Sequence, residues 1–164
     1  MPSYLDRKVE WSSVAETRPR IVVLVGLPGS GKSAYVTQAG GMALSSDELR
    51  RVLSDDPGNQ TIHTRVFAVL RNLLLHRLEL ECPVTYIDAT NLTPAERLPY
   101  LELAKLFDCD VEAVYFDVPV AECQRRNRSR DRVVPDDVIA EMAKRLVPPT
   151  VKEGFRRVRR VSLG

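Results

Sequence analysis

Short runs of apolar residues alternate along the chain with longer stretches in which apolar residues recur every three or four positions. The runs are typical of strands buried on both faces, and the recurring spacing is typical of amphipathic helices. The runs predict strands near 21–25, 42–44, 84–87, 111–116 and 157–163, although the last alternates poorly. The recurring spacing predicts helices over about 32–38, 45–53, 61–79, 93–106, from 120 onward and 135–146. Strands that alternate with helices indicate right-handed crossovers and an α/β fold with a parallel sheet of about five strands, covered on both faces.

Residues at two of the predicted helix starts carry capping signals. Ser45 is followed three positions later by Glu48, and Thr93 is followed by Pro94 and Glu96. In both places a hydroxyl oxygen can accept a hydrogen bond from a free N–H group of the first helical turn. These signals predict where the second and fourth helices begin.

The composition is that of an ordinary globular domain, because 44% of the 164 residues are hydrophobic and 28% are charged. The longest apolar run covers only 21–25, far short of the ~18 residues that a membrane span needs. Residues 1–6 lack the basic-then-apolar order of a signal peptide, so we expect a cytoplasmic protein without a membrane partner. Three widely spaced cysteines argue against a disulfide framework or a zinc module.

Charge is distributed unevenly along the chain. Residues 1–120 carry 12 Lys and Arg against 16 Asp and Glu, a balance of −4, whereas residues 121–164 carry 12 against 6, a balance of +6. The densest basic run is 125–132, and it indicates a local site for phosphate groups or for a polyanion. The alternative is a solvated helix face, but such a face usually mixes its signs.

The segment Gly26–Ser33 fits the phosphate-loop pattern G-x-x-x-x-G-K-[ST] and lies between a predicted strand and a predicted helix. Glycines let such a loop wrap a phosphate, and its N–H groups meet the positive end of the helix dipole. Lys32 supplies charge to the β and γ phosphates, and Ser33 offers a hydroxyl ligand to Mg²⁺. The sequence therefore predicts that ATP or another nucleoside triphosphate binds, with Mg²⁺, to Gly26, Gly29, Ser30, Gly31, Lys32 and Ser33.

Other classes of nucleotide-binding protein fit this sequence less well. The guanine-reading element Asn-Lys-x-Asp of GTPases does not occur, and a D-x-x-G match at 55–58 does not follow a predicted strand. A motor ATPase would normally be longer and would place an acidic pair at the end of a strongly apolar strand. The remaining class is a small phosphotransferase in which a mobile lid closes over ATP.

Asp47 and Arg50 lie three residues apart, just after the second predicted strand. Residues three apart share a helix face, and the carboxyl ends of parallel strands meet at one edge, so we expect the pair near the phosphate loop. There Asp47 would accept the proton of an attacking hydroxyl, while Arg50 would hold an anionic group of the acceptor. The alternative is that Asp47 is only a favourable acid in a first helical turn.

Asp88 ends the third predicted strand, and Asn91 follows three residues later. Asp88 is a candidate for holding a Mg²⁺-bound water or for orienting Arg50. An acid at a strand end is also a common turn device, and this alternative stays open.

The arginine-rich segment is predicted to form the lid. Arg126 and Arg130 are four residues apart, so both would face ATP and meet the charge that spreads over the transferring phosphoryl group. Arginine offers phosphate a planar set of several donors. We expect Arg125, Arg128 and Arg132 to project elsewhere.

Taken together, these motifs resemble the polynucleotide 5′-hydroxyl kinases, a family of small P-loop phosphotransferases. The matching elements are the phosphate loop, the Asp-x-x-Arg pair at 47–50, the Asp-Ala-Thr-Asn strand end at 88–91, and Arg-Asn-x-x-Arg at 126–130 followed by Val-Pro at 134–135. The resemblance spans roughly residues 20–163. It implies a P-loop NTPase fold similar to adenylate kinase, with a kinase domain over 20–164 preceded by an N-terminal arm over 1–19.

The resemblance also implies an activity, the transfer of the γ-phosphate of ATP, with Mg²⁺, to the 5′-OH end of DNA or RNA in nucleic-acid end healing. It implies Asp47 as general base, Arg50 on the acceptor phosphate with Asp88 and Asn91 nearby, and Arg126 with Arg130 on the ATP phosphates. Members of the family often carry a phosphatase or ligase module on the same chain. Because 164 residues leave no room for either, healing of a 3′ end is not expected.

Two other hypotheses stay open at this point. The same architecture serves kinases of gluconate, antibiotics, sugar nucleotides and aminoacylated tRNA, so the acceptor can instead be the hydroxyl of a small molecule. Its pocket would involve the long helix around Arg65 and Arg71. A nucleotide-binding module without phosphoryl transfer is the third hypothesis, and the Asp47/Arg50 pair argues against it because a passive binder needs neither group. The sequence does not indicate the oligomeric state.

Overall fold

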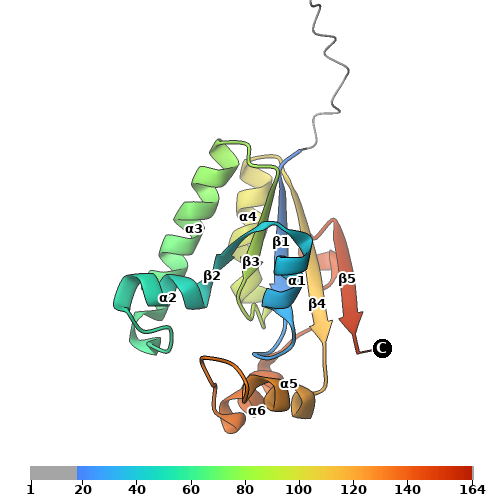
Figure 1. Ribbon diagram of the computed structural model, residues 1–164. Coiled ribbons are helices and arrows are strands. Elements are labelled where there is room, and N and C mark those ends of the chain that lie inside the picture. Colours follow the sequence, from blue (N-terminus) through green and yellow to red (C-terminus); the bar gives the residue numbers. More distant parts are fainter. Residues whose placement is uncertain (1–17, 164) are drawn as a thin grey trace, which may run out of the picture.

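The computed structural model describes residues 18–163, so almost all of the predicted arm over 1–19 lies outside the described residues. Five strands form one sheet in the order β2-β3-β1-β4-β5, and every neighbouring pair is parallel (Figure 1). The strands are β1 (Arg20–Val25), β2 (Met42–Ser45), β3 (Val84–Asp88), β4 (Asp110–Asp117) and β5 (Arg157–Ser162). The predicted parallel sheet of five strands is confirmed.

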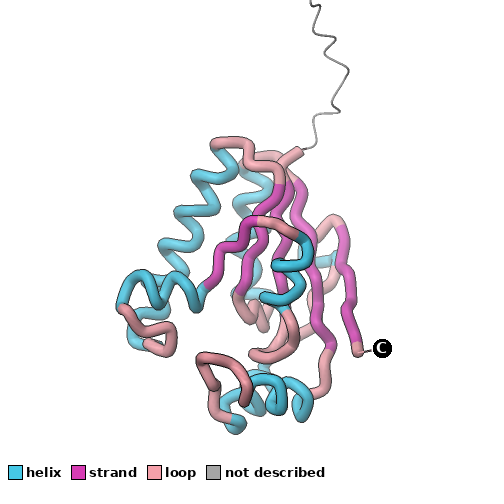
Figure 2. The backbone as a smooth tube through the Cα atoms, viewed as in Figure 1, coloured by secondary structure: helices cyan, strands magenta, loops and turns pink. Residues whose placement is uncertain are grey.

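Helices separate each strand from the next along the chain (Figure 2). They are α1 (Lys32–Ala39), α2 (Ser46–Ser54), α3 (His63–Glu79), α4 (Pro94–Leu106), α5 (Val120–Asn127) and α6 (Asp136–Arg145), with 3-10 turns at Gln60–Ile62 and Val151–Glu153. The capping signals are confirmed, since Ser45 and Thr93 each accept from the N–H three residues later, at 3.3 Å. Between residues 18 and 163 no helix has the length and apolar character of a membrane span.

Strand β1 lies at the centre of the sheet, and its side chains alternate between two cores. Ile21, Val23 and Val25 face the core that α3 and α4 cover, whereas Val22 and Leu24 face the core that α1 covers (Figure 1). All five side chains are buried. Burial on both faces explains why this strand reads as a continuous apolar run rather than as an alternating pattern.

A third apolar cluster packs the segment 118–145, which holds α5 and α6 and which we call the lid, against the carboxyl end of the sheet (Figure 1). Its members come from the phosphate loop, the loop after β3 and the lid itself: Leu27, Leu92, Val118, Cys123, Val134 and Ile139. Helix α5 ends at Asn127, whose side chain donates to the carbonyl of Val134 at 2.6 Å and accepts from its N–H at 3.0 Å. These two bonds close the loop over 128–134, so Arg130 lies in a loop and not on the helix that carries Arg126.

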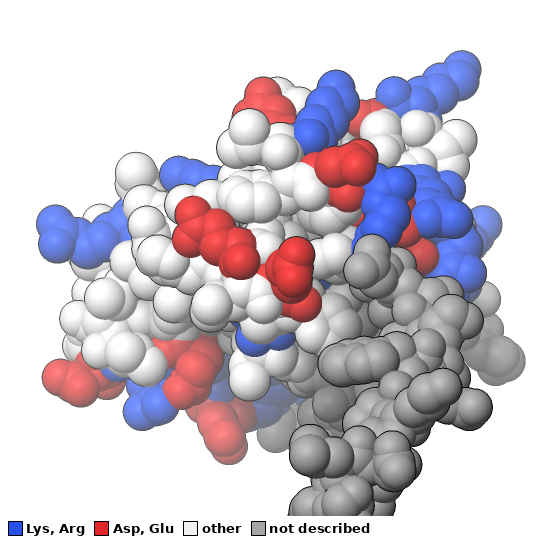
Figure 3. All heavy atoms as spheres, turned by 90° about the horizontal axis from the view of Figure 1, so that it is seen from above, with Lys and Arg blue, Asp and Glu red and all other residues white. Residues whose placement is uncertain are grey.

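The order of the strands places a ligand site at the carboxyl end of the sheet. The chain passes from β1 to β2 and β3 on one side, and then to β4 and β5 on the other. In open α/β sheets, ligands bind outside the carboxyl ends of the strands at such a switch point. Figure 3 shows the opposite end, where basic side chains lie beside acidic ones and ion pairs such as Arg18–Asp108 and Arg156–Asp110 form.

Candidate active site

The segment Gly26–Ser33 forms a loop between β1 and α1, as predicted. Gly29 and Gly31 have φ angles of +81° and +101°, in the left-handed region that favours glycine. A Cβ atom at Gly29 would lie 2.3 Å from the carbonyl oxygen of Cys123 on α5. Both the backbone angle and the close approach of the lid therefore require glycine at this position.

We expect Gly29→Ala to lower the free energy of unfolding by about 2–4 kcal/mol, because left-handed backbone and an overpacked contact each cost roughly 1–3 kcal/mol. Gly40→Ala is the matched control, since φ is +67° there and nothing lies within 4 Å of the added Cβ. Urea unfolding of both variants separates the cost of the clash from the cost of the backbone angle. Equal destabilisation would contradict the close packing of α5 on the loop.

Lys32 lies at the base of the loop and is only 8% exposed. Its ammonium group donates to the carbonyl oxygens of Gly26 and Leu27, each at 2.8 Å. Burial lowers the pKa of Lys32 to about 8. Phosphate oxygens in the loop would supply an anionic partner, which favours the charged form and raises this pKa again.

Ser33 and Asp88 meet at the mouth of the loop, where Ser33 Oγ donates to Asp88 Oδ2 at 2.8 Å. Hydroxyl and carboxylate oxygens are ligands that Mg²⁺ accepts, and the ion usually takes others from phosphates and water. Within residues 18–163 there is no group of three or more His, Cys, Asp or Glu side chains that could hold a metal ion. The pair therefore fits a Mg²⁺ ion that arrives with a nucleotide. Among the described residues, Asp88 and Arg50 line the same cleft without a hydrogen bond or ion pair between them, so the role of Asp88 in orienting that arginine stays a prediction.

Asp47 lies in the first turn of α2, where three guanidinium groups surround its carboxylate. It accepts from Arg50 Nη1 at 3.2 Å and from Arg130 Nη2 at 3.5 Å, and it forms an ion pair with Arg132. The contact with Arg50 follows from the predicted helical spacing. The expectation that Arg132 projects elsewhere is wrong, because 128–134 is a closed loop in which helical spacing does not set side-chain directions.

Arg50 is nearly buried, with 5% of its surface exposed. One η nitrogen contacts Asp47, the other lies 3.2 Å from His63 Nδ1, and its buried Nε has no partner among the described residues. Burial and the nearby charge of Arg50 both lower the pKa of His63. A neutral His63 can accept from Arg50 through Nδ1. No motif in the sequence pointed to His63.

The lid arginines face different parts of the site. Arg126 Nε donates to Glu122 Oε1 at 2.7 Å, and one of its η nitrogens lies 3.8 Å from the Cβ position of Gly31, beside the phosphate loop. Hydrogen bonds from Arg125 and Arg126 lower the pKa of Glu122 to about 2. Arg126 is thus held next to the phosphate loop, whereas Arg130 reaches across to the carboxylate of α2.

The amide nitrogen of Asn91 supports a loop beside the cleft. Asn91 is buried with φ at +48°, and its amide nitrogen donates to the carbonyl oxygens of Leu24 at 2.7 Å and Ala89 at 3.3 Å. The main-chain carbonyl of Asn91 accepts from Arg97 Nη1 at 2.9 Å. The side chain ties the loop after β3 to the end of β1, and its contact with substrate stays a prediction.

These groups line one cleft of about 1240 Å³ at the carboxyl end of the sheet. Sites for one small ligand usually have about 300–1,000 Å³, so the cleft has room for a nucleotide and a second substrate. Its lining includes Gly29, Gly31, Lys32, Ser33, Asp47, Arg50, His63, Asp88, Asn91, Arg126, Arg130 and Arg132. Gly26 and Ser30 lie beneath this lining, where the buried Ser30 Oγ has no partner among the described residues. The cleft thus joins a phosphate-binding loop to the carboxylates of Asp47 and Asp88 and to several guanidinium groups.

The family described as AAA domain, AAA_33, matches residues 21–149, which is most of the chain. This chain belongs to the AAA_33 family. The match includes the phosphate loop, four of the strands and both lid helices. The AAA_33 protein therefore has a P-loop NTPase fold of the kinase type, as predicted, and it is a nucleotide-binding protein.

Solved structures of three kinds share the fold of this AAA_33 protein. A chain of the Pnkp1/Rnl/Hen1 RNA repair complex is 22% identical, with a TM-score of 0.67 over 79% of this chain and 44% of that chain. A gluconokinase from Sinorhizobium meliloti 1021 is 18% identical, with a TM-score of 0.59 over 89% and 83%. The Mycobacterium tuberculosis APS kinase CysC, in complex with AMPPNP and APS, is 20% identical, with a TM-score of 0.53 over 88% of both chains. This chain spans less than half of the length of the repair-complex chain, and at these identities the likeness shows the fold alone.

Proposed function

We propose that this AAA_33 protein is a polynucleotide 5′-hydroxyl kinase, which transfers the γ-phosphate of ATP to a 5′-OH end of DNA or RNA in end repair. The observation that carries the proposal is the contact between Asp47 and Arg50 in the cleft that also holds Lys32. A carboxylate beside a buried guanidinium suits a hydroxyl that has an anionic group close behind it, which describes a 5′ end. A chain of an RNA repair complex shares this fold, which is consistent with a nucleic-acid acceptor.

On the donor side, the loop and the lid bind the triphosphate. Lys32 exchanges its two carbonyl acceptors for phosphate oxygens, and Arg126 donates to the same phosphates from the lid. Ser33 and Asp88 would hold Mg²⁺ at the mouth of the loop. When bound, Mg²⁺ neutralises part of the charge on the β and γ phosphates.

On the acceptor side, Asp47 accepts the proton of the 5′-OH while the oxygen of that hydroxyl forms a bond to the γ-phosphorus. The bond between the γ-phosphorus and the β–γ bridging oxygen breaks, and ADP leaves with that electron pair. Arg130 and Arg132 form ion pairs with the Asp47 carboxylate in the structure. Because a triphosphate carries more charge than a carboxylate, these arginines turn toward it when the nucleotide enters, and Asp47 is then free to act as the base.

Incubation with γ-labelled ATP, Mg²⁺ and a 5′-OH oligonucleotide tests this proposal, beside a panel of sugars and small alcohols. We expect label on the oligonucleotide. The same oligonucleotide with a 5′-phosphate is the control, since it has no hydroxyl to accept the label there. Label on a sugar or an alcohol, with none on the oligonucleotide, would overturn the proposal.

A kinase of a small-molecule hydroxyl is the second candidate, because the gluconokinase and the APS kinase match over 83% and 88% of their own chains. Of the two arginines expected around such a pocket, Arg71 lines the cleft and Arg65 does not. Polynucleotide binding weakens as salt rises, because phosphate contacts release counterions, whereas binding of a small acceptor depends less on salt. The acceptor KM at about 50 and 200 mM salt separates the two candidates.

We expect Arg50→Lys to restore little of the acceptor affinity that Arg50→Ala loses, with a KM for the oligonucleotide about 10–100-fold above that of the wild type in both variants. Lysine presents its donors from one nitrogen, so it lacks the planar set of separate nitrogens with which Arg50 contacts Asp47 and His63 and would bind an acceptor phosphate. Steady-state kinetics with oligonucleotide as the varied substrate measures the effect. A KM of wild-type value in Arg50→Lys would mean that a single positive charge at this position is enough to bind the oligonucleotide.

A further inference from the structure

Helix α3 presents three cleft-lining residues at intervals of four: His63, Phe67 and Arg71. Residues four apart lie on one face of a helix, so these three form a strip along the acceptor side of the cleft. At 1.5 Å per residue the strip is about 12 Å long. Stacked nucleotides rise about 3.4 Å each along one strand, so the strip spans more than one nucleotide.

The first two members of the strip form an aromatic pair beside Arg50. The ring centroids of His63 and Phe67 are 4.8 Å apart, with their planes inclined by 45°. Phe67 is partly buried, because one side packs against the core and another lines the cleft. Aromatic faces in a basic groove are the feature on which unpaired bases stack.

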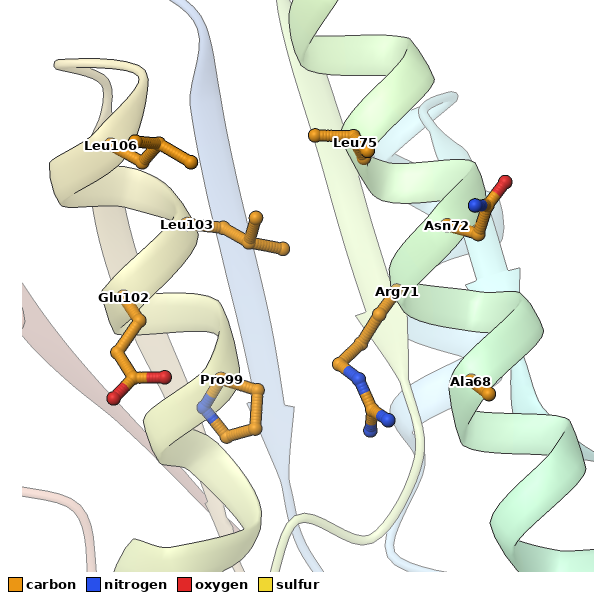
Figure 4. Close-up of a pocket in the computed structure, with 8 residues that line it drawn as sticks. All are labelled: Ala68, Arg71, Asn72, Leu75, Pro99, Glu102, Leu103 and Leu106. Carbon is orange, nitrogen blue, oxygen red and sulfur yellow. The ribbon is translucent and has the colours of Figure 1, made fainter.

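Arg71 lies at the far end of the strip and is partly buried. Arg77, on the same helix, donates to Thr85 and to the carbonyl of Val84, whereas no hydrogen bond or ion pair holds the Arg71 side chain within residues 18–163. Arg71 and Pro99 line both the cleft and a second hollow of about 530 Å³ between α3 and α4, where Figure 4 shows them facing each other. A partly buried cation without a partner suits an anion that extends from the cleft.

The second hollow limits how far a polyanion can extend. Its other lining includes the apolar side chains of Leu75, Leu103 and Leu106 and the carboxylate of Glu102 (Figure 4). A carboxylate repels phosphate groups, and a leucine wall offers them no hydrogen bonds. The acceptor site therefore ends at Arg71.

We propose, on the basis of the proposed kinase function, that the acceptor is a single-stranded oligonucleotide of at least two nucleotides. Arg50 binds the phosphate that follows the attacked nucleoside, the base stacks on the pair His63–Phe67, and Arg71 binds the next phosphate. A guanidinium, an aromatic pair and a second guanidinium in this order match the phosphate, base and phosphate of an unpaired strand. A duplex end keeps its bases stacked on each other, so the strip selects against it.

The test compares the KM of two acceptors with a 5′-OH, a nucleoside 3′-monophosphate and a tetranucleotide. We expect the tetranucleotide to have a KM about tenfold lower in the wild type, from the additional charged contact. In Arg71→Ala the two acceptors should have similar KM values, so the advantage of length is lost. The slope of log KM against the logarithm of the salt concentration should also fall by about 0.7, the value for one phosphate contact on a single strand. Phe67→Leu keeps an apolar side chain but removes the aromatic face, so it should also raise the KM of the tetranucleotide.

Arg65→Ala is the matched control, because Arg65 is an exposed arginine on the same helix that does not line the cleft. It should keep both the advantage of length and the salt slope. This inference is overturned if the tetranucleotide keeps its lower KM in Arg71→Ala, or if Arg65→Ala loses that lower KM to the same extent. Both acceptors are still phosphorylated in either case, so the kinase proposal is unaffected. A lower KM for a blunt duplex than for the single strand also overturns this inference. If the wild type phosphorylates neither acceptor, the proposed function fails and this inference falls with it.

Discussion

Lys32→Ala is expected to slow phosphoryl transfer by about 10³-fold, because a preorganised donor at the reacting group is typically worth roughly 10²–10³ in rate. The ammonium group is held in place by carbonyl oxygens at 2.8 Å, in a loop that closes around it. Alanine supplies neither the charge nor the donors that the β and γ phosphates need. Single-turnover measurements with saturating acceptor give the rate of the chemical step in each protein.

Lys105→Ala is the matched control for this prediction, since Lys105 is an exposed lysine of α4 that does not line the cleft. It should react at the rate of the wild type. Thermal unfolding followed by circular dichroism checks that Lys32→Ala is folded. Turnover close to normal in the folded Lys32→Ala protein would rule out the role of the phosphate loop that we infer.

Asp47→Asn is expected to lower kcat by about 10²–10⁴-fold, the range for loss of a general base. Asparagine has nearly the same size, and its amide oxygen can still accept from Arg50, but it does not take up the proton of the hydroxyl. The affinity for ATP should be kept or should rise, because Arg130 and Arg132 lose their ion pairs with the carboxylate. Burst kinetics measures the chemical step, and calorimetry measures the Kd of ATP.

Asp55→Asn is the matched control, because Asp55 ends the same helix and does not line the cleft. Its φ is +58°, and asparagine tolerates this left-handed conformation. The variant should keep the kcat of the wild type. A kcat for Asp47→Asn within a small factor of the wild-type value would return Asp47 to the role of a favourable acid in a first helical turn.

The elements that were predicted correctly are those whose signals are local. Ser45 and Thr93 each accept from the N–H three residues later, so a pattern of four residues indicates the helix start. The continuous run over 21–25 reflects a central strand that is buried on both faces. The poor alternation over 157–162 has an equally local reason, because β5 is an edge strand and its arginines are exposed.

The residues whose contacts the sequence did not reveal belong to segments without a regular period. Arg132 lies in the loop that Asn127 closes, and the direction of its side chain depends on two hydrogen bonds that no sequence spacing reveals. Asn91 follows a strand end, where an amide can bind a substrate or support a loop. Its hydrogen bond to the carbonyl of Leu24 joins it to a residue 67 positions away in the chain.

By itself, the amino-acid sequence determined the strands and helices, the phosphate loop and the helical face that carries Asp47 and Arg50. Only the tertiary structure decided that the carboxylate of Asp47 meets Arg130 and Arg132, 83 and 85 residues away, and that Arg50 contacts His63. Backbone periodicity and capping act over a few residues, so they leave a readable pattern. Contacts between the lid and α2 depend on how the sheet, the helices and the closed loop pack together, and packing of distant segments leaves no periodic signal in the chain.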